Sequence, residues 1–231
     1  IGDRPGHTLD LNLGSVKTSA LGMGASSAGG TSLVGQRIGI AAAGGDLLLN
    51  GAIGEGDIKI NGQDVGAIAD NADMEAILKA INDNVDNVTA TGFNTVTAKN
   101  KGSGVTAAGN LVIEVLEYGQ SATTTFTISA SENMAELVDN INNEVGGVVQ
   151  ASLTDGKLTL SNDTGATISV LDGSASASSY DGGSGFFVTE KVYGGFIKMD
   201  SDDGNPIRIE RGNTHATAEG LDADLAALGF R

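Results

Sequence analysis

The sequence contains no cysteine, no tryptophan and only 2 prolines in 231 residues. A chain without cysteine can form neither a disulfide framework nor a thiolate metal site. The low proline content also excludes a polyproline or collagen-like structure. No uninterrupted apolar stretch reaches the roughly 18 residues that identify a membrane-spanning helix. We therefore expect no membrane partner.

Basic residues are also scarce, because 13 Lys and Arg stand against 29 Asp and Glu, a formal net charge of −16. A protein that binds nucleic acid needs clustered Lys and Arg to displace the counterions of the phosphates, and an anionic membrane surface makes the same demand. The charge balance therefore argues against both kinds of partner. Acidity of this kind keeps crowded protein surfaces soluble and apart.

What the sequence does contain is a strand, helix and hairpin pattern in its centre. Phe126 and Ile128 alternate with polar residues, as in a half-buried strand. Ser131 is suited to cap the following helix, which Gly146 and Gly147 end. Asp155-Gly156 then predicts a tight turn between two strands. The predicted helix carries one apolar stripe, formed by Met134, Leu137, Val138 and Ile141.

The same pattern has relatives elsewhere in the chain. Its helix recurs 60 positions upstream without a gap, at about residues 73–84, where Asn71 or Asp73 can act as the N-cap. Residues 156–170 also match residues 195–209, so we count two full copies and one partial copy, too few for a solenoid. We predict a β-rich α+β fold of small antiparallel-sheet subdomains, each with one packed amphipathic helix. The upstream helix residues are Met74, Ile77, Leu78, Ile81, Asn82 and Val85.

At these positions the sequence resembles a repeat found in the outer domains of bacterial flagellins, and also in the filament cap and other hook-associated proteins. Residues 6–22 and 225–230 further resemble the segments by which a flagellin leaves and re-enters its inner helical domain. The terminal helices through which flagellins polymerise have no counterpart here, so we expect the outer, variable part of a flagellin. The repeat pattern reads Phe126-x-Ile128, Leu137-Val138-x-x-Ile141-Asn142, Val149-x-Ala151, Gly156-x-Leu158-x-Leu160 and Gly165-x-x-Ile168.

Strand patterns at both ends of the sequence flank the repeats. We therefore predict a discontinuous, β-rich base domain of residues 1–45 and 186–231. A first repeat subdomain would occupy residues 46–118 and a second residues 119–185. Such an insertion would bring the two ends of the chain close together.

Residues that could bind a metal or take part in catalysis are few and scattered. His7 and His215 have no Cys or carboxylate partners nearby in the sequence, so we expect solvated loop histidines. The acidic segment 200–205 is the best calcium candidate, but the sixth and twelfth positions of an EF-hand loop would be Asn205 and Arg211 instead of Gly and Glu. We therefore predict a hairpin turn there, with Asx side chains bonded to the backbone.

Pairs of carboxylates such as Asp202/Asp203 and Glu114/Glu117 could suggest a glycosidase. Among 29 acidic residues, however, accidental pairs are expected, and no aromatic sugar platform accompanies these. We therefore expect no enzymatic activity, no catalytic residue, no cofactor and no metal site.

The low-complexity segment 172–185 predicts an exposed loop. Flagellin outer domains are often O-glycosylated on Ser or Thr, so the resemblance implies four candidate modification sites. These are Ser174, Ser176, Ser178 and Ser179.

The resemblance implies a structural role in motility, as the antigenic and glycan-bearing surface of an extracellular flagellar filament. The partners would be other flagellin protomers, joined through the absent helical domains, and the chain alone would be monomeric. One alternative is a domain of a filament cap or hook-associated protein. Another is a bacterial adhesin or carbohydrate-binding module, for which Tyr180, Phe186 and Phe187 are the one aromatic cluster.

Overall fold

The structure is a computed structural model of the chain. It describes residues 31–39, 49, 51–120, 122–173, 183–186, 191–212 and 218–230. The described part is α+β and dominated by antiparallel strands, as predicted. His7, His215 and the four candidate serines Ser174, Ser176, Ser178 and Ser179 lie outside the described residues.

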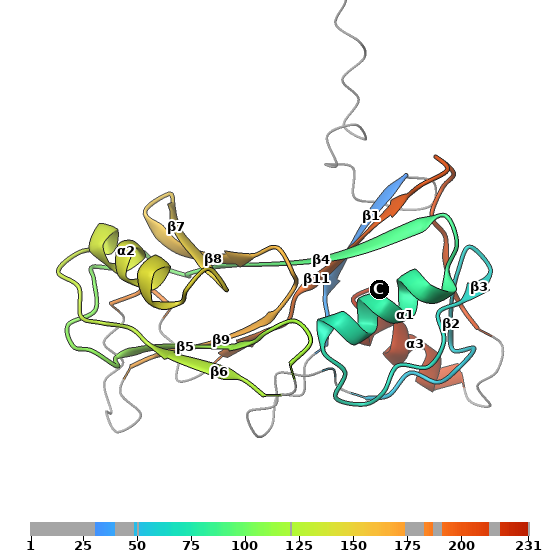
Figure 1. The fold of residues 1–231 in the computed structure, drawn as a ribbon, viewed down its shortest axis with the longest axis horizontal. Coiled ribbons are helices and arrows are strands. Elements are labelled where there is room, and N and C mark those ends of the chain that lie inside the picture. The colour runs from blue at the N-terminus through green and yellow to red at the C-terminus, as the bar shows by residue number, and fades with distance from the viewer. Residues whose placement is uncertain are drawn as a thin grey trace, which may run out of the picture.

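Three antiparallel sheets organise the described chain (Figure 1). The five-stranded sheet has the order β1 (Ser32–Arg37), β11 (Phe196–Ser201), β4 (Val88–Thr97), β8 (Lys157–Asn162) and β7 (Gln150–Thr154). The four-stranded sheet has the order β10 (Lys191–Tyr193), β9 (Thr167–Asp172), β5 (Leu111–Leu116) and β6 (Thr124–Thr127). The three-stranded sheet has the order β12 (Ile209–Arg211), β2 (Ile58–Ile60) and β3 (Gln63–Asp64). The helices are α1 (Met74–Asn84), α2 (Met134–Glu144) and α3 (Ala218–Ala227).

The buried apolar residues form two separate clusters, which define two modules. Module 1 comprises the described residues of 31–93 and 195–230, with α1 and α3. Module 2 comprises the described residues of 94–194, with α2. Strand β4 runs through both modules and joins them into one elongated molecule (Figure 1).

The clusters can be compared with the three units predicted from the sequence. Ile38 and Ile197 come from the predicted base domain and Ile77 from the first predicted repeat, yet all three belong to one cluster. Strand β5, also assigned to the first repeat, contributes to the other cluster.

Each module buries the apolar stripe of its own helix. In α1 the stripe residues Met74, Ile77, Leu78 and Ile81 are all buried, as predicted. In α2, Leu137 and Ile141 are fully buried, whereas Met134 and Val138 are partly buried against the same cluster. Both helices lie over the five-stranded sheet, α1 beside β4 and α2 beside β7.

The N-cap residue agrees with the sequence-based prediction in α1 and differs from it in α2. Asp73, one of the two predicted candidates, caps α1, because its carboxylate accepts from Ala76 N. The predicted cap of α2, Ser131, is wrong, because Asn133 takes that position. The Ser131 hydroxyl is buried and accepts from Val105 N at 2.9 Å, so it is committed to a loop of the same module.

The tight turn predicted from sequence at Asp155-Gly156 is present and joins β7 to β8. A second turn of the same kind, Asn61-Gly62, joins β2 to β3. All four residues have positive φ, which is the requirement of a type I′ turn between twisted strands. The predicted hairpin at residues 200–205 is wrong, because β11 and β12 on either side of the turn belong to different sheets.

The two modules use the same order of strand pairing. In module 2, β5 lies between β6 and β9, α2 follows β6, and β7 pairs with β8. In module 1, β2 lies between β3 and β12, α1 follows β3, and β4 pairs with β11. Strand β11 therefore corresponds to β8, and β12 corresponds to β9.

Residues that match in the sequence repeat also occupy corresponding strands. Ile209 and Val170 are equivalent positions of the repeat, and they pair with Ile60 in module 1 and with Ile113 in module 2. The predicted partial third copy, residues 195–209, therefore occupies the place of the missing second half of the module that begins with β2. The whole of module 2 is inserted between the two halves, where β7 and β8 have only a two-residue turn.

Candidate functional site at the junction of the modules

Asn94 lies where β4 passes from module 1 into module 2. It falls on the inward-facing row of a strand whose burial alternates, and it is only 1% exposed. Its amide group donates to the carbonyl oxygens of Ala166 and Tyr193, both at 2.9 Å. Its Oδ1 accepts from Nη1 of Arg37 at 2.7 Å. One buried side chain thus joins four separate segments of the chain.

Arg37, at the end of β1, makes further contacts around Asn94. Its guanidinium also donates to the carbonyl oxygen of Gly194 at 2.6 Å and to that of Thr95. It lies 4.6 Å from the ring centre of Phe196 and 5.4 Å from that of Tyr193, which are cation–π distances. Burial lowers the pKa of Arg37, and the nearby Tyr193 acts in the opposite direction. Burial raises the pKa of the Tyr193 hydroxyl, an effect that Arg37 opposes.

Three glycines allow the modules to approach at the backbone. A Cβ atom on Gly195 would overlap the carbonyl oxygen of Gly165, and one on Gly92 would lie 2.5 Å from the carbonyl oxygen of Thr164. Gly165 also has a φ of +80°, which L side chains rarely adopt. The turn between β8 and β9 is therefore packed directly against β4 and the start of β11.

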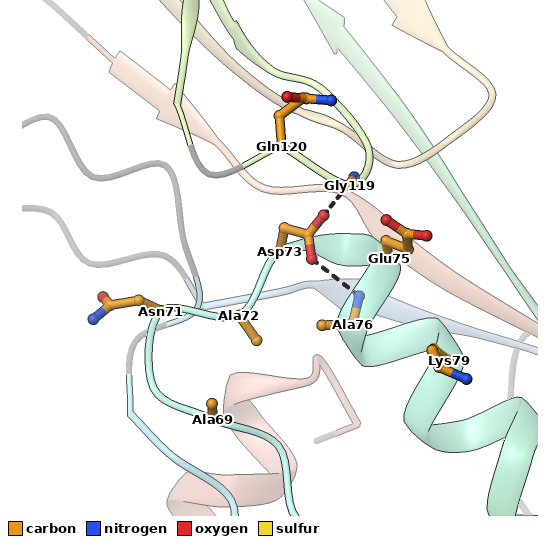
Figure 2. Close-up of a pocket in the computed structure, with 9 residues that line it drawn as sticks. All are labelled: Ala69, Asn71, Ala72, Asp73, Glu75, Ala76, Lys79, Gly119 and Gln120. Atoms are coloured by element: carbon orange, nitrogen blue, oxygen red, sulfur yellow. Dashed lines mark hydrogen bonds between the residues drawn. The ribbon is translucent and has the colours of Figure 1, made fainter.

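A second contact joins the start of α1 to the turn between β5 and β6 (Figure 2). One carboxylate oxygen of Asp73 caps α1, while the other accepts from Gly119 N at 2.7 Å. The neighbouring Tyr118 is 43% exposed. Its pKa is raised by burial first, then by the negative charges of Glu75 and Asp73.

An open cavity of about 410 Å³ lies beside this contact (Figure 2). None of its nine lining residues is Ser, Thr, Cys, His or Tyr, so its lining holds no hydroxyl or thiol nucleophile paired with a histidine base. Its Lys79 pairs with Asp83 on the exposed side of α1. The lining consists of Ala69, Asn71, Ala72, Asp73, Glu75, Ala76, Lys79, Gly119 and Gln120.

The acidic residues considered from sequence are engaged in local hydrogen bonds. The Asp203 carboxylate accepts from Ser201 Oγ at 2.8 Å and from Asn205 N at 2.9 Å, which is the predicted Asx bonding. Asp202 accepts from Thr89. Among the residues that the structure describes, no three His, Cys, Asp or Glu side chains lie together as a metal site would require.

The members of the other acidic pair also bond to threonines, Glu114 to Thr125 and Glu117 to Thr124. At the module junction, by contrast, Arg37 and Asn94 form a partly buried polar network, and neither residue belongs to a motif recognised in the sequence. The signal was present: Asn94 is the only amide on the inward row of β4, which otherwise holds Val, Ala and Gly.

Comparison with solved structures gives a likeness at low sequence identity. No protein-family model and no curated protein sequence matches the chain. The chain is similar to the crystal structure of the D1-D2-D3 domains of the flagellar cap protein FliD from Escherichia coli, at 16% identity. The match covers 79% of this chain and 72% of that chain, with a TM-score of 0.27. At that score the likeness does not establish a common fold.

Within the described part of the chain, no helix has both the length and the apolar character needed to cross a membrane.

Proposed function

We propose that the chain is the outer, solvent-facing part of a bacterial flagellar filament subunit, with a structural and not a catalytic role. The observation that carries this proposal is the correspondence between the flagellin-like pattern and a complete module. Phe126, Leu137, Ile141 and Leu160 of the pattern all contribute to the apolar cluster of module 2. The sequence resemblance thus coincides with a packed unit that the chain builds twice.

The remaining pattern residues serve the fold of the same module. The Asn142 side chain bonds to both backbone groups of Ala151, and Gly156 supplies a positive φ in the β7–β8 turn. These residues therefore stabilise the fold of the module, and their polar groups are bonded within it. That use suits a protein whose work is to present a stable surface.

The outer surface agrees with such a role. Tyr118 and Leu153 are the only large apolar side chains that are exposed among the described residues. Scattered single apolar residues do not form an adhesive patch, and a net charge of −16 adds mutual repulsion. Filaments coated with such modules would remain separate in suspension.

The arrangement of the modules fits the same proposal. The C-terminal end of α3 and the residues after it bond to β1 and the residues that follow it, because Gln36 N donates to Gly229 O and Gly39 N donates to Ala227 O. The first and last described segments therefore both lie on module 1. A stem joined to both would place module 2 on the outside, and polymerisation would belong to that stem.

Immunogold labelling of the source bacterium, with antibodies raised against this chain, would test the proposal. We expect gold particles along the whole filament and none on a strain from which the gene is deleted. Labelling restricted to the filament tip or the hook junction would instead identify a cap or hook-associated protein. Labelling of the cell body alone, as for an adhesin, would refute the flagellar proposal.

A further inference from the structure

Module 1 is discontinuous in sequence, whereas module 2 is continuous. Strand β4 ends at Thr97 and its partner β11 begins at Phe196, with nearly all of module 2 between them. The corresponding strands of module 2, β7 and β8, are joined by the turn Asp155-Gly156. The equivalent strand pair is therefore joined by a two-residue turn in module 2, whereas in module 1 its two strands are separated by nearly all of module 2.

When module 2 is folded, the end of β4 and the start of β11 lie next to each other. The Asn94 side chain donates to Tyr193 O at 2.9 Å, across the base of the module. Directly beside this bond, Ile38 N donates to Gly195 O at 2.9 Å. The pairing of β4 with β11 then begins at Phe93 and Phe196, whose rings stack with centres 5.1 Å apart.

We propose that module 2 is the folding template of module 1, so that module 1 depends on module 2 but not the reverse. The probability of closing a flexible loop falls with about the 3/2 power of its length. Replacing a two-residue turn by a disordered loop of roughly 100 residues therefore lowers the probability of pairing β4 with β11 on the order of 10²-fold. Module 1 gains this factor only while module 2 is folded.

The sheets and the apolar cluster of module 2 do not require a folded module 1. Its described apolar cluster draws only on residues between Val96 and Tyr193. Its four-stranded sheet is complete within the module, and β8 is flanked by β7 and by the Asn94–Thr97 part of β4. Opening of module 1 removes none of these contacts. It does remove the Arg37 hydrogen bonds to Asn94, Thr95 and Gly194 at the base of module 2, but these acceptors can then bond to water.

Two matched substitutions in the full chain test the dependence. Ile81 in α1 and Ile141 in α2 occupy corresponding helix positions, and both side chains are fully buried. Replacing either with Ala removes the same atoms and leaves a cavity in one module. Hydrogen exchange followed by mass spectrometry reports on each module separately, through peptides from α1 and β11 and from α2 and β9.

We expect Ile141→Ala to accelerate exchange in both modules by a similar factor, on the order of 30-fold or more, because each opening of module 2 also opens module 1. Ile81→Ala should accelerate exchange in module 1 and change module 2 by less than about threefold. The proposal is overturned if each variant affects only its own module, or if both variants open the whole molecule equally. Should Ile141→Ala not yield folded protein, the pair Ile81→Val and Ile141→Val makes the same comparison at lower cavity volume.

This inference depends on the order of strands and not on the flagellar proposal. A failed exchange experiment would leave the labelling result untouched, and the reverse also holds.

Discussion

Asn82 and Asn142 make the same pair of hydrogen bonds in two different modules. Asn82 donates to Ala90 O at 3.0 Å and accepts from Ala90 N at 2.7 Å. Asn142 donates to Ala151 O at 3.1 Å and accepts from Ala151 N at 2.7 Å. In each module this side chain fixes the helix to the neighbouring strand, although the bonded alanine follows the asparagine by 8 residues in module 1 and by 9 in module 2.

Replacing either asparagine with Ala should destabilise the protein by about 1–3 kcal/mol, because a strand N–H and C=O lose their partner. Chemical unfolding in urea, followed by circular dichroism, would measure the loss. Asn143→Ala is the matched control, since Asn143 is exposed on the same helix. Equal effects of Asn142→Ala and Asn143→Ala would show that the paired bonds contribute nothing.

Arg37 should be the most sensitive basic residue of the described chain. Arg37→Met leaves Asn94 Oδ1 and the carbonyl oxygens of Thr95 and Gly194 without their donor, which we expect to cost about 3 kcal/mol. Arg208→Met is the control, because its ion pair with Glu210 is exposed and should be worth less than about 1 kcal/mol. Urea unfolding of both variants makes the comparison, and similar midpoints would contradict the importance of the junction.

Gly195→Ala tests the backbone contact between the modules. The added methyl group would overlap the carbonyl oxygen of Gly165, and neither backbone can rotate away as a side chain would. We expect a loss of about 1–3 kcal/mol in thermal or chemical unfolding. At Gly39 a Cβ would lie 3.4 Å from its nearest neighbour, so Gly39→Ala should be close to neutral. A neutral result for Gly195→Ala would mean that the turn after β8 can move away from β11.

The features that were predictable from sequence are local ones. The stripe of α1, the Asp73 cap and the turn Asp155-Gly156 each depend on residues within about one turn or hairpin of one another. The cap of α2 was mistaken because Ser131 and Asn133 are both good capping residues. The choice between them is made by Val105, a residue far away in sequence that bonds to Ser131.

The order of the strands was not predictable in this way. Residues 195–209 match residues 156–170 in pattern, which suggested a third unit. A pattern identifies a strand but not its partner, and β11 pairs with a strand about 100 residues earlier. The contacts of Arg37 and Asn94 were not predictable from sequence for the same reason. They form only when β1, β4 and the segment before β11 meet.

The turn at residues 201–205 makes a prediction about pH. The pKa of Asp203 is lowered because Asn205 donates from its backbone and its side chain, and because Ser201 donates from its hydroxyl. A carboxylate whose pKa is lower in the folded chain stabilises the fold above its unfolded pKa, about 3.9. This contribution is lost as the pH falls through the folded pKa.

Asp203→Asn keeps the shape of the side chain and removes its charge. We therefore expect the variant to be less stable than the parent protein between about pH 5 and 7, with the difference disappearing toward about pH 2. Thermal unfolding at a series of pH values measures this directly. Asn205→Ala removes one of the donors and should move the Asp203 titration, followed by NMR, upward toward its ordinary value. A stability difference that is constant from pH 2 to 7 would mean that the carboxylate charge makes no contribution at this turn.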